Sequence, residues 1–179
     1  MSYQPRASQP SHAAMFQRDE WELLVTLPRR VLVTAATTEP AEARGAAEGI
    51  AGIEAIASGL ASPSPLVREV VGSIYSESHS EPEELLGDSD GDAVLQTLSA
   101  CRYAAELLGG KTAPDDAAAY REWLCHIAAV TTGVARGMTG QGTVPPVQPT
   151  AGQQERAPAG RVGQLESRFL YALSGVLRP

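Results

Sequence analysis

The sequence predicts an all-α fold, a single-domain bundle of about six helices with no sheet. Apolar residues recur at intervals of three and four along most of the chain, which is the helical period. Proline, serine and acidic residues stand where the helices are expected to begin. VLVTAATT is the one β-branched run that favours a strand, and the sequence has no second such run to pair with it.

Composition and charge limit the classes of function. The chain has 179 residues, 43% of them hydrophobic and only 5% aromatic, so we expect one core packed largely through small side chains. The formal net charge of -7 argues against a nucleic-acid binder, which needs a concentrated basic surface. No window has the apolar length needed to cross a membrane, and the N-terminus has no signal-peptide pattern. We therefore expect a cytoplasmic location, with neither nucleic acid nor membrane as a partner.

Two segments have the composition of irregular chain. Residues 1–15 are rich in Ser, Gln and Pro and predict a disordered tail. The segment at about 138–160 is rich in Gly, Pro, Gln and Thr and predicts a flexible loop. The helical bundle domain is expected at 16–178, including that loop.

The first two helices are expected to meet at Pro28. Residues 17–27 carry acidic side chains early and apolar ones throughout, which predicts a short helix. Pro28 is expected to end it, because proline has no backbone N–H for a helix interior. The same residue suits a first helical turn, so a second helix is predicted over 28–37.

A longer helix is expected over 41–60, with a heptad-like seam. The seam repeats at alternating spacings of four and three and consists of Ala46, Ile50, Ile53, Ala57 and Leu60. Gly45, Gly49 and Gly52 lie at close intervals on neighbouring positions. Glycine costs about 1 kcal/mol in a helix interior. These glycines therefore indicate either the close approach of another backbone or a weak helix.

Two further helices follow. Ser64, as the N-cap, and Pro65, in the first turn, predict the start of one of them. An acidic and polar connection, which we expect to be exposed, leads to the next helix over about 91–108. That helix has Cys101 on its main apolar face, where we expect a core side chain, and Tyr103 on its far side. A helix that is apolar on two faces is expected near the centre of the bundle.

The stretch from Ala113 to Met138 has the clearest helix signals. Pro114 suits a first turn, the two aspartates after it complement the helix dipole, and Gly137 is placed to end the helix. Its apolar face consists of Tyr120, Leu124, Ile127, Thr131, Val134 and Met138. We expect this helix to pack against the helix that carries Cys101, and a terminal helix over 162–176 to complete the core.

The candidate site residues lie on this same helix. Trp123 and Tyr120 are a possible interaction surface, because aromatic anchors are enriched at interfaces; the alternative is that the core buries both. Glu122, Cys125 and His126 form a polar cluster on the other side of the helix. A metal site needs at least one more ligand, which the sequence does not place nearby, so we expect an ordinary helix surface. No catalytic, cofactor-binding or metal-binding residue is assigned.

Four motifs occur in a fixed order along the chain. They are an opening helix with Asp19-Glu20-Trp21, an Ala/Val-rich helix from Pro28, a helix start at Ser64 to Val67, and an AAAYxxWLxxIAxxVAxxA helix over 117–135. In this order they resemble a family of uncharacterised bacterial all-helical proteins with an EEW-type opening helix. The link after the last motif is longer here than in the family and carries several prolines. The resemblance implies a helical fold and a bacterial source, and no function comes with it.

Two classes of function fit these patterns. The first is a non-enzymatic helical bundle that acts through protein–protein interaction, with a partner protein or by self-association. The sequence favours it because signals of a packed core outnumber signals of a site. The alternative is a small helical enzyme or a ligand-binding or metal-binding bundle. It would have a pocket between helices and use Glu122, His126 or Tyr103 as polar groups.

Overall fold

The computed structural model describes residues 11–37, 46–76, 90–132 and 162–177, and within these ranges it contains helices and no strand. The elements are, in order, η1 (His12–Met15), α1 (Arg18–Thr37), α2 (Ala46–Ser58), η2 (Gly59–Ala61), α3 (Pro65–Ser76), α4 (Asp90–Lys111), α5 (Pro114–Thr131) and α7 (Val162–Val176). This confirms the predicted all-α bundle.

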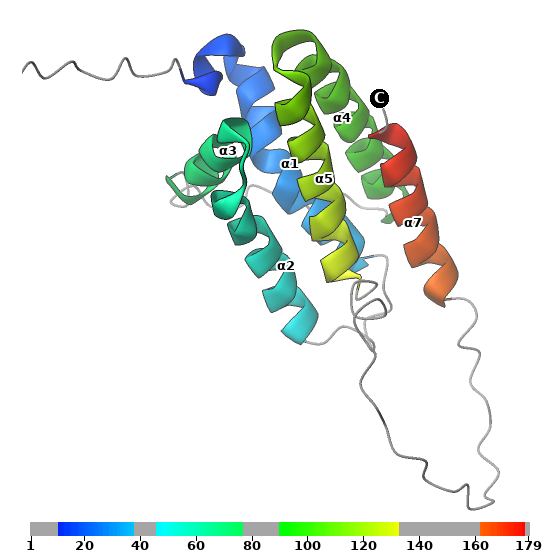
Figure 1. The fold of residues 1–179 in the computed structure, drawn as a ribbon. Helices are drawn as coiled ribbons and strands as arrows, with labels where there is room; N and C mark the ends of the chain where they lie inside the picture. Colours follow the sequence, from blue (N-terminus) through cyan, green and yellow to red (C-terminus); the bar gives the residue numbers. More distant parts are fainter. Residues whose placement is uncertain (1–10, 38–45, 77–89, 133–161, 178–179) are drawn as a thin grey trace, which may run out of the picture.

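Helix α5 lies at the centre of the described bundle. It contacts α1, α2, α3, α4 and α7, and Figure 1 shows α2 and α7 on opposite sides of it. The contacts of α5 with α1 and α2 are more extensive than its contact with α4. The predicted packing of this helix against α4 is therefore present, but it is a smaller part of the core than expected.

The structure confirms the predicted start of α3, the predicted core position of Cys101 on α4 and the predicted apolar face of α5. Ser64 caps α3, since its Oγ accepts the backbone N–H of Val67 at 3.3 Å, and Cys101 on α4 is fully buried. The predicted face of α5 is also confirmed over its described length, by Tyr120, Leu124, Ile127 and Thr131. Val134, Gly137 and Met138, predicted in the same helix, lie outside the described residues, as does the loop predicted at about 138–160.

The predicted break at Pro28 is wrong, because α1 runs without interruption through this residue. A proline inside a helix leaves the carbonyl four residues earlier without its N–H partner. Here that carbonyl belongs to Leu24, and the Tyr120 hydroxyl of α5 donates to it at 2.7 Å. The hydrogen bond that Pro28 removes from α1 is thus replaced by one from a neighbouring helix.

Regular structure begins earlier in the N-terminal segment than the sequence predicts. Residues 12–15 form η1, although the whole of 1–15 is expected to be a disordered tail; residues 1–10 lie outside the described part. The backbone N–H of His12 donates to Glu69 of α3 at 2.8 Å, and that of Ala13 donates to the same carboxylate at 3.3 Å. This attachment depends on a residue of a distant helix, which composition does not reveal.

None of the described helices combines the length and the apolar character that crossing a membrane requires.

Candidate functional site

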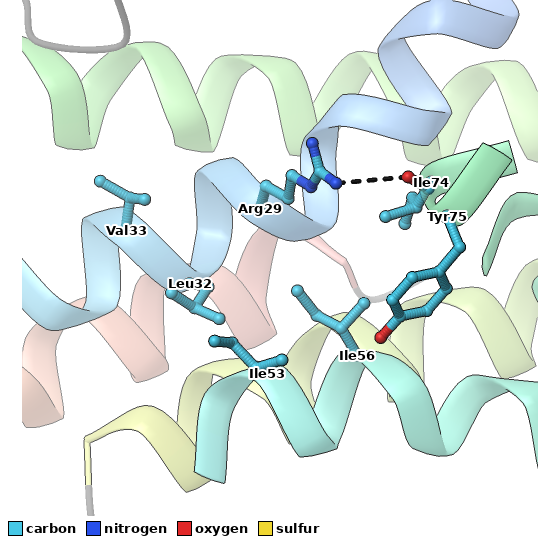
Figure 2. A pocket seen from close by; sticks show the side chains of 7 residues that line it. All are labelled: Arg29, Leu32, Val33, Ile53, Ile56, Ile74 and Tyr75. Carbon is cyan, nitrogen blue, oxygen red and sulfur yellow. Dashed lines mark hydrogen bonds between the residues drawn. The ribbon is translucent and has the colours of Figure 1, made fainter. Parts of the chain in front are cut away.

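An open apolar cavity of about 360 Å³ lies between α1, α2 and the end of α3 (Figure 2). Its lining residues are Arg29, Leu32, Val33, Ile53, Ile56, Ile74 and Tyr75. We call this cavity the α1–α2 groove. Its walls are largely hydrocarbon, with the Arg29 guanidinium and the Tyr75 hydroxyl as the polar side-chain groups.

Helical spacing places these side chains in one groove. Leu32 and Val33 lie three and four residues after Arg29 on α1, and Ile53 and Ile56 are three apart on α2, so each set lies along one helix face. The Arg29 Nη2 donates to the carbonyl oxygen of Ile74 at 3.2 Å (Figure 2). Arg29 thereby joins α1 to a carbonyl near the C-terminal end of α3.

The side of α2 next to the groove exposes its large apolar side chains. Ile50, Ile53 and Leu60 of the adjoining η2 are 58%, 59% and 53% exposed, and we call these three the outward face of α2. They belong to the seam that the sequence predicts. The seam is therefore present in α2, but within the chain it is not the core-facing side.

The inward face of α2 consists of Gly52 and the buried side chains of Ala55 and Ile56. A Cβ atom on Gly52 would lie 2.8 Å from Thr131 Oγ1 and 2.9 Å from Leu32 Cδ1. At Gly59, one residue past α2, it would lie 2.7 Å from Val71 Cγ2 and 2.9 Å from Trp123 Cε2. The nearest neighbours of Gly52 are thus side-chain atoms, whereas one of the two predicted reasons for the glycines is the close approach of another backbone. Gly45 and Gly49 lie outside the residues whose surroundings are described.

Trp123 and Tyr120 are buried, in keeping with the second of the two predicted alternatives. Trp123 is 7% exposed, and its indole N–H donates to the carbonyl of Ala55 at 3.1 Å. Burial raises the pKa of the Tyr120 hydroxyl well above its usual value, with a further contribution from Cys101, so it remains a proton donor toward Leu24. Both side chains join helices inside the bundle and form no outer surface.

The three residues of the predicted polar cluster on α5 differ in exposure. Glu122 and His126 are exposed, whereas Cys125 is half-buried and engages Ser174 of α7 through its side chain. Burial raises the Cys125 pKa, the Ser174 hydrogen bond partly opposes this, and the charge of Glu122 raises it again. Within the described residues no three His, Cys, Asp or Glu side chains are grouped closely enough to hold a metal ion.

The two cysteines are protonated thiols. Burial, followed by the nearby Cys125, raises the pKa of Cys101 to about 12, and Arg30 lowers it slightly. Both cysteines are free of disulfides. Because the thiolate is the nucleophilic form, neither cysteine is an activated nucleophile.

A second polar cluster, which the sequence reasoning missed, joins η1 to α3 and α5. The His12 ring lies with Nδ1 at 3.1 Å from Glu69 Oε2 and Nε2 at 3.7 Å from Asp116 Oδ2. Ser11 also donates to Glu69, and Ser64 Oγ donates to Asp116 Oδ1 at 2.5 Å. Ser64 therefore contacts the carboxylate and not the imidazole, so the set lacks the serine-to-histidine contact of a hydrolytic triad. It is a structural attachment of the N-terminal segment.

The sequence contained a partial signal for the groove. The seam on α2 is detectable from its spacing, but Arg29 and Tyr75 carry no motif and reach the groove only through the packing of α1 on α3.

Comparison of the chain with known protein families, curated proteins and solved structures finds no match. The resemblance to a bacterial helical family stays a prediction.

Proposed function

We propose that the protein is a non-enzymatic interaction module that binds a protein partner at the outward face of α2 and the adjoining α1–α2 groove. The observation that carries this proposal is the exposure of Ile50, Ile53 and Leu60 beside an apolar cavity. Apolar side chains that adjoin a hollow are typical of a surface that receives an amphipathic helix. A partner helix laid there would remove both the outward face and the groove from water.

The alternative of an enzyme or metal-binding bundle has less support. Its expected polar groups, Tyr103, Glu122 and His126, are exposed, and none of them lines the α1–α2 groove.

The net charge of -7 supports a partner other than nucleic acid. The two free cysteines are usual for a reducing compartment, which supports the cytoplasm as the place of action.

Site-specific photocrosslinking tests the proposal. A benzophenone amino acid replaces Ile53 in the full chain, and the protein is irradiated in extract of its source organism. The matched control carries the same group at Leu95 of α4, which is 64% exposed. We expect a discrete crosslinked product from position 53, several times more abundant than from position 95. Equal yields from the two positions would show that the outward face of α2 is not a binding surface.

A further inference from the structure

The outward face of α2 has the spacing of a helix-pairing seam. With Ala57 added, the residues of this face are separated by three, four and three positions, the alternation by which two helices interlock side chains. In order, these residues are Ile50, Ile53, Ala57 and Leu60. Ala57 is half-buried and the other three are more than half exposed. The seam therefore lies open along α2 and η2, beside the α1–α2 groove.

The inward packing of α2 prevents this seam from turning into the core of its own chain. Gly52 meets Leu32 and Thr131 so closely that an added Cβ would overlap both, and Gly59 meets Trp123 in the same way. A rotation that brought Ile50 or Ile53 inward would put a branched side chain where a single carbon does not fit. The outward position of the isoleucines thus follows from the close packing of α2 on α1 and α5.

We propose that the occupant of this face is a second copy of the same chain, paired through α2 about a two-fold axis. The proposal rests on the proposed function, since it identifies the partner that the interaction surface binds. A seam with this regular spacing is complementary to its own copy, and a two-fold axis makes each contact twice. The groove beside each seam provides a hollow for apolar side chains of the partner's α2.

Charge also permits this pairing, even though each copy carries a formal net charge of -7. Glu54 is the one charged residue between Ile50 and Leu60 in the sequence. Arg29, of opposite sign, lines the adjacent groove. Two copies joined here bring together mainly hydrocarbon, with both signs of charge at its border, while most of the acidic charge lies elsewhere in the chain.

Analytical ultracentrifugation of the full chain at about 1 to 200 μM, in buffer of physiological salt, tests the proposal. We expect the mass to rise with concentration from 18.8 kDa toward twice that value. Ile53→Glu places a charge in the seam and should weaken dimerisation by roughly a hundredfold, because each dimer loses two buried isoleucines. Leu95→Glu, at an equally exposed apolar position on α4, should leave it unchanged.

A monomeric mass at every concentration would overturn the second copy as the occupant. A dimer that resists Ile53→Glu, or one that Leu95→Glu disrupts, would also overturn it, because the interface would then lie elsewhere. Circular dichroism of both variants verifies the fold, which an exposed substitution should preserve. If the chain is monomeric and position 53 still crosslinks to a different protein, the proposed function stands and the dimer does not. If position 53 crosslinks to nothing, both are wrong.

Discussion

Tyr120 and Pro28 act as a pair, although 92 positions of the chain separate them. Pro28 removes one hydrogen bond from the interior of α1, and the Tyr120 hydroxyl supplies a replacement to the same carbonyl, that of Leu24, at 2.7 Å. A buried carbonyl without a donor costs about 1 to 3 kcal/mol. The tyrosine hydroxyl therefore makes a continuous α1 possible despite its proline.

Removing this hydroxyl should destabilise the fold. We expect Tyr120→Phe to lower the free energy of unfolding, measured by urea titration, by about 1 to 3 kcal/mol. The matched background is Pro28→Ala, in which residue 28 regains an N–H that can donate to Leu24 within α1. In that background the loss of the hydroxyl should cost at least 1 kcal/mol less. An equal cost in both backgrounds would show that Leu24 does not depend on Tyr120.

Among the elements, α2 owes its orientation to glycine contacts. Gly59 lies where an added Cβ would overlap Val71 and Trp123, whereas at Gly72 of α3 an added Cβ would meet no atom within 4 Å. We expect Gly59→Ala to lower the free energy of unfolding by about 1 to 3 kcal/mol through overpacking. Gly72→Ala should raise it by up to about 1 kcal/mol, since alanine is the better helix former. If both variants have similar stability in urea titration, the close approach at Gly59 does not determine how α2 packs on the bundle.

The elements also show which features can be predicted from sequence. The start of α5 at Pro114 was predictable because its signals lie in the first turn itself. The break at Pro28 was predicted wrongly because the compensating donor comes from another helix. The spacing of Ile50 and Ile53 was recognised, but which side of α2 faces the core depends on contacts with Leu32, Thr131 and Trp123. Local sequence patterns do not reveal such contacts between distant parts of the chain.

For the whole molecule, the cluster around Glu69 joins the N-terminal segment to the bundle. Burial is the largest single influence on this carboxyl and raises its pKa, but the combined hydrogen bonds from Ser11, His12 and Ala13 outweigh burial. The pKa of Glu69 is therefore lowered from its usual 4.5. In the same cluster the His12 ring contacts this carboxyl through one nitrogen and the Asp116 carboxyl through the other.

This lowered pKa makes the attachment sensitive to acid. A carboxyl that binds its proton more weakly in the folded state stabilises the fold fully above its unfolded pKa, and that stability is lost as the pH falls through the folded pKa. We thus expect the free energy of unfolding to fall below about pH 4.5, the usual value for this group. Glu20, whose pKa is also lowered, first by its hydrogen bond with Lys111, contributes a slope of the same sign.

Glu69→Gln isolates the part that belongs to the N-terminal attachment. At pH 7 the substitution should cost about 1 kcal/mol, the net worth of a hydrogen bond at a partly exposed site. Between pH 7 and pH 3 the variant should lose less stability than the natural chain, because glutamine does not titrate, while Glu20 titrates in both proteins. Urea titrations at several pH values measure the difference. Parallel pH curves for the two proteins would mean that Glu69 does not hold η1 on α3 through its charge.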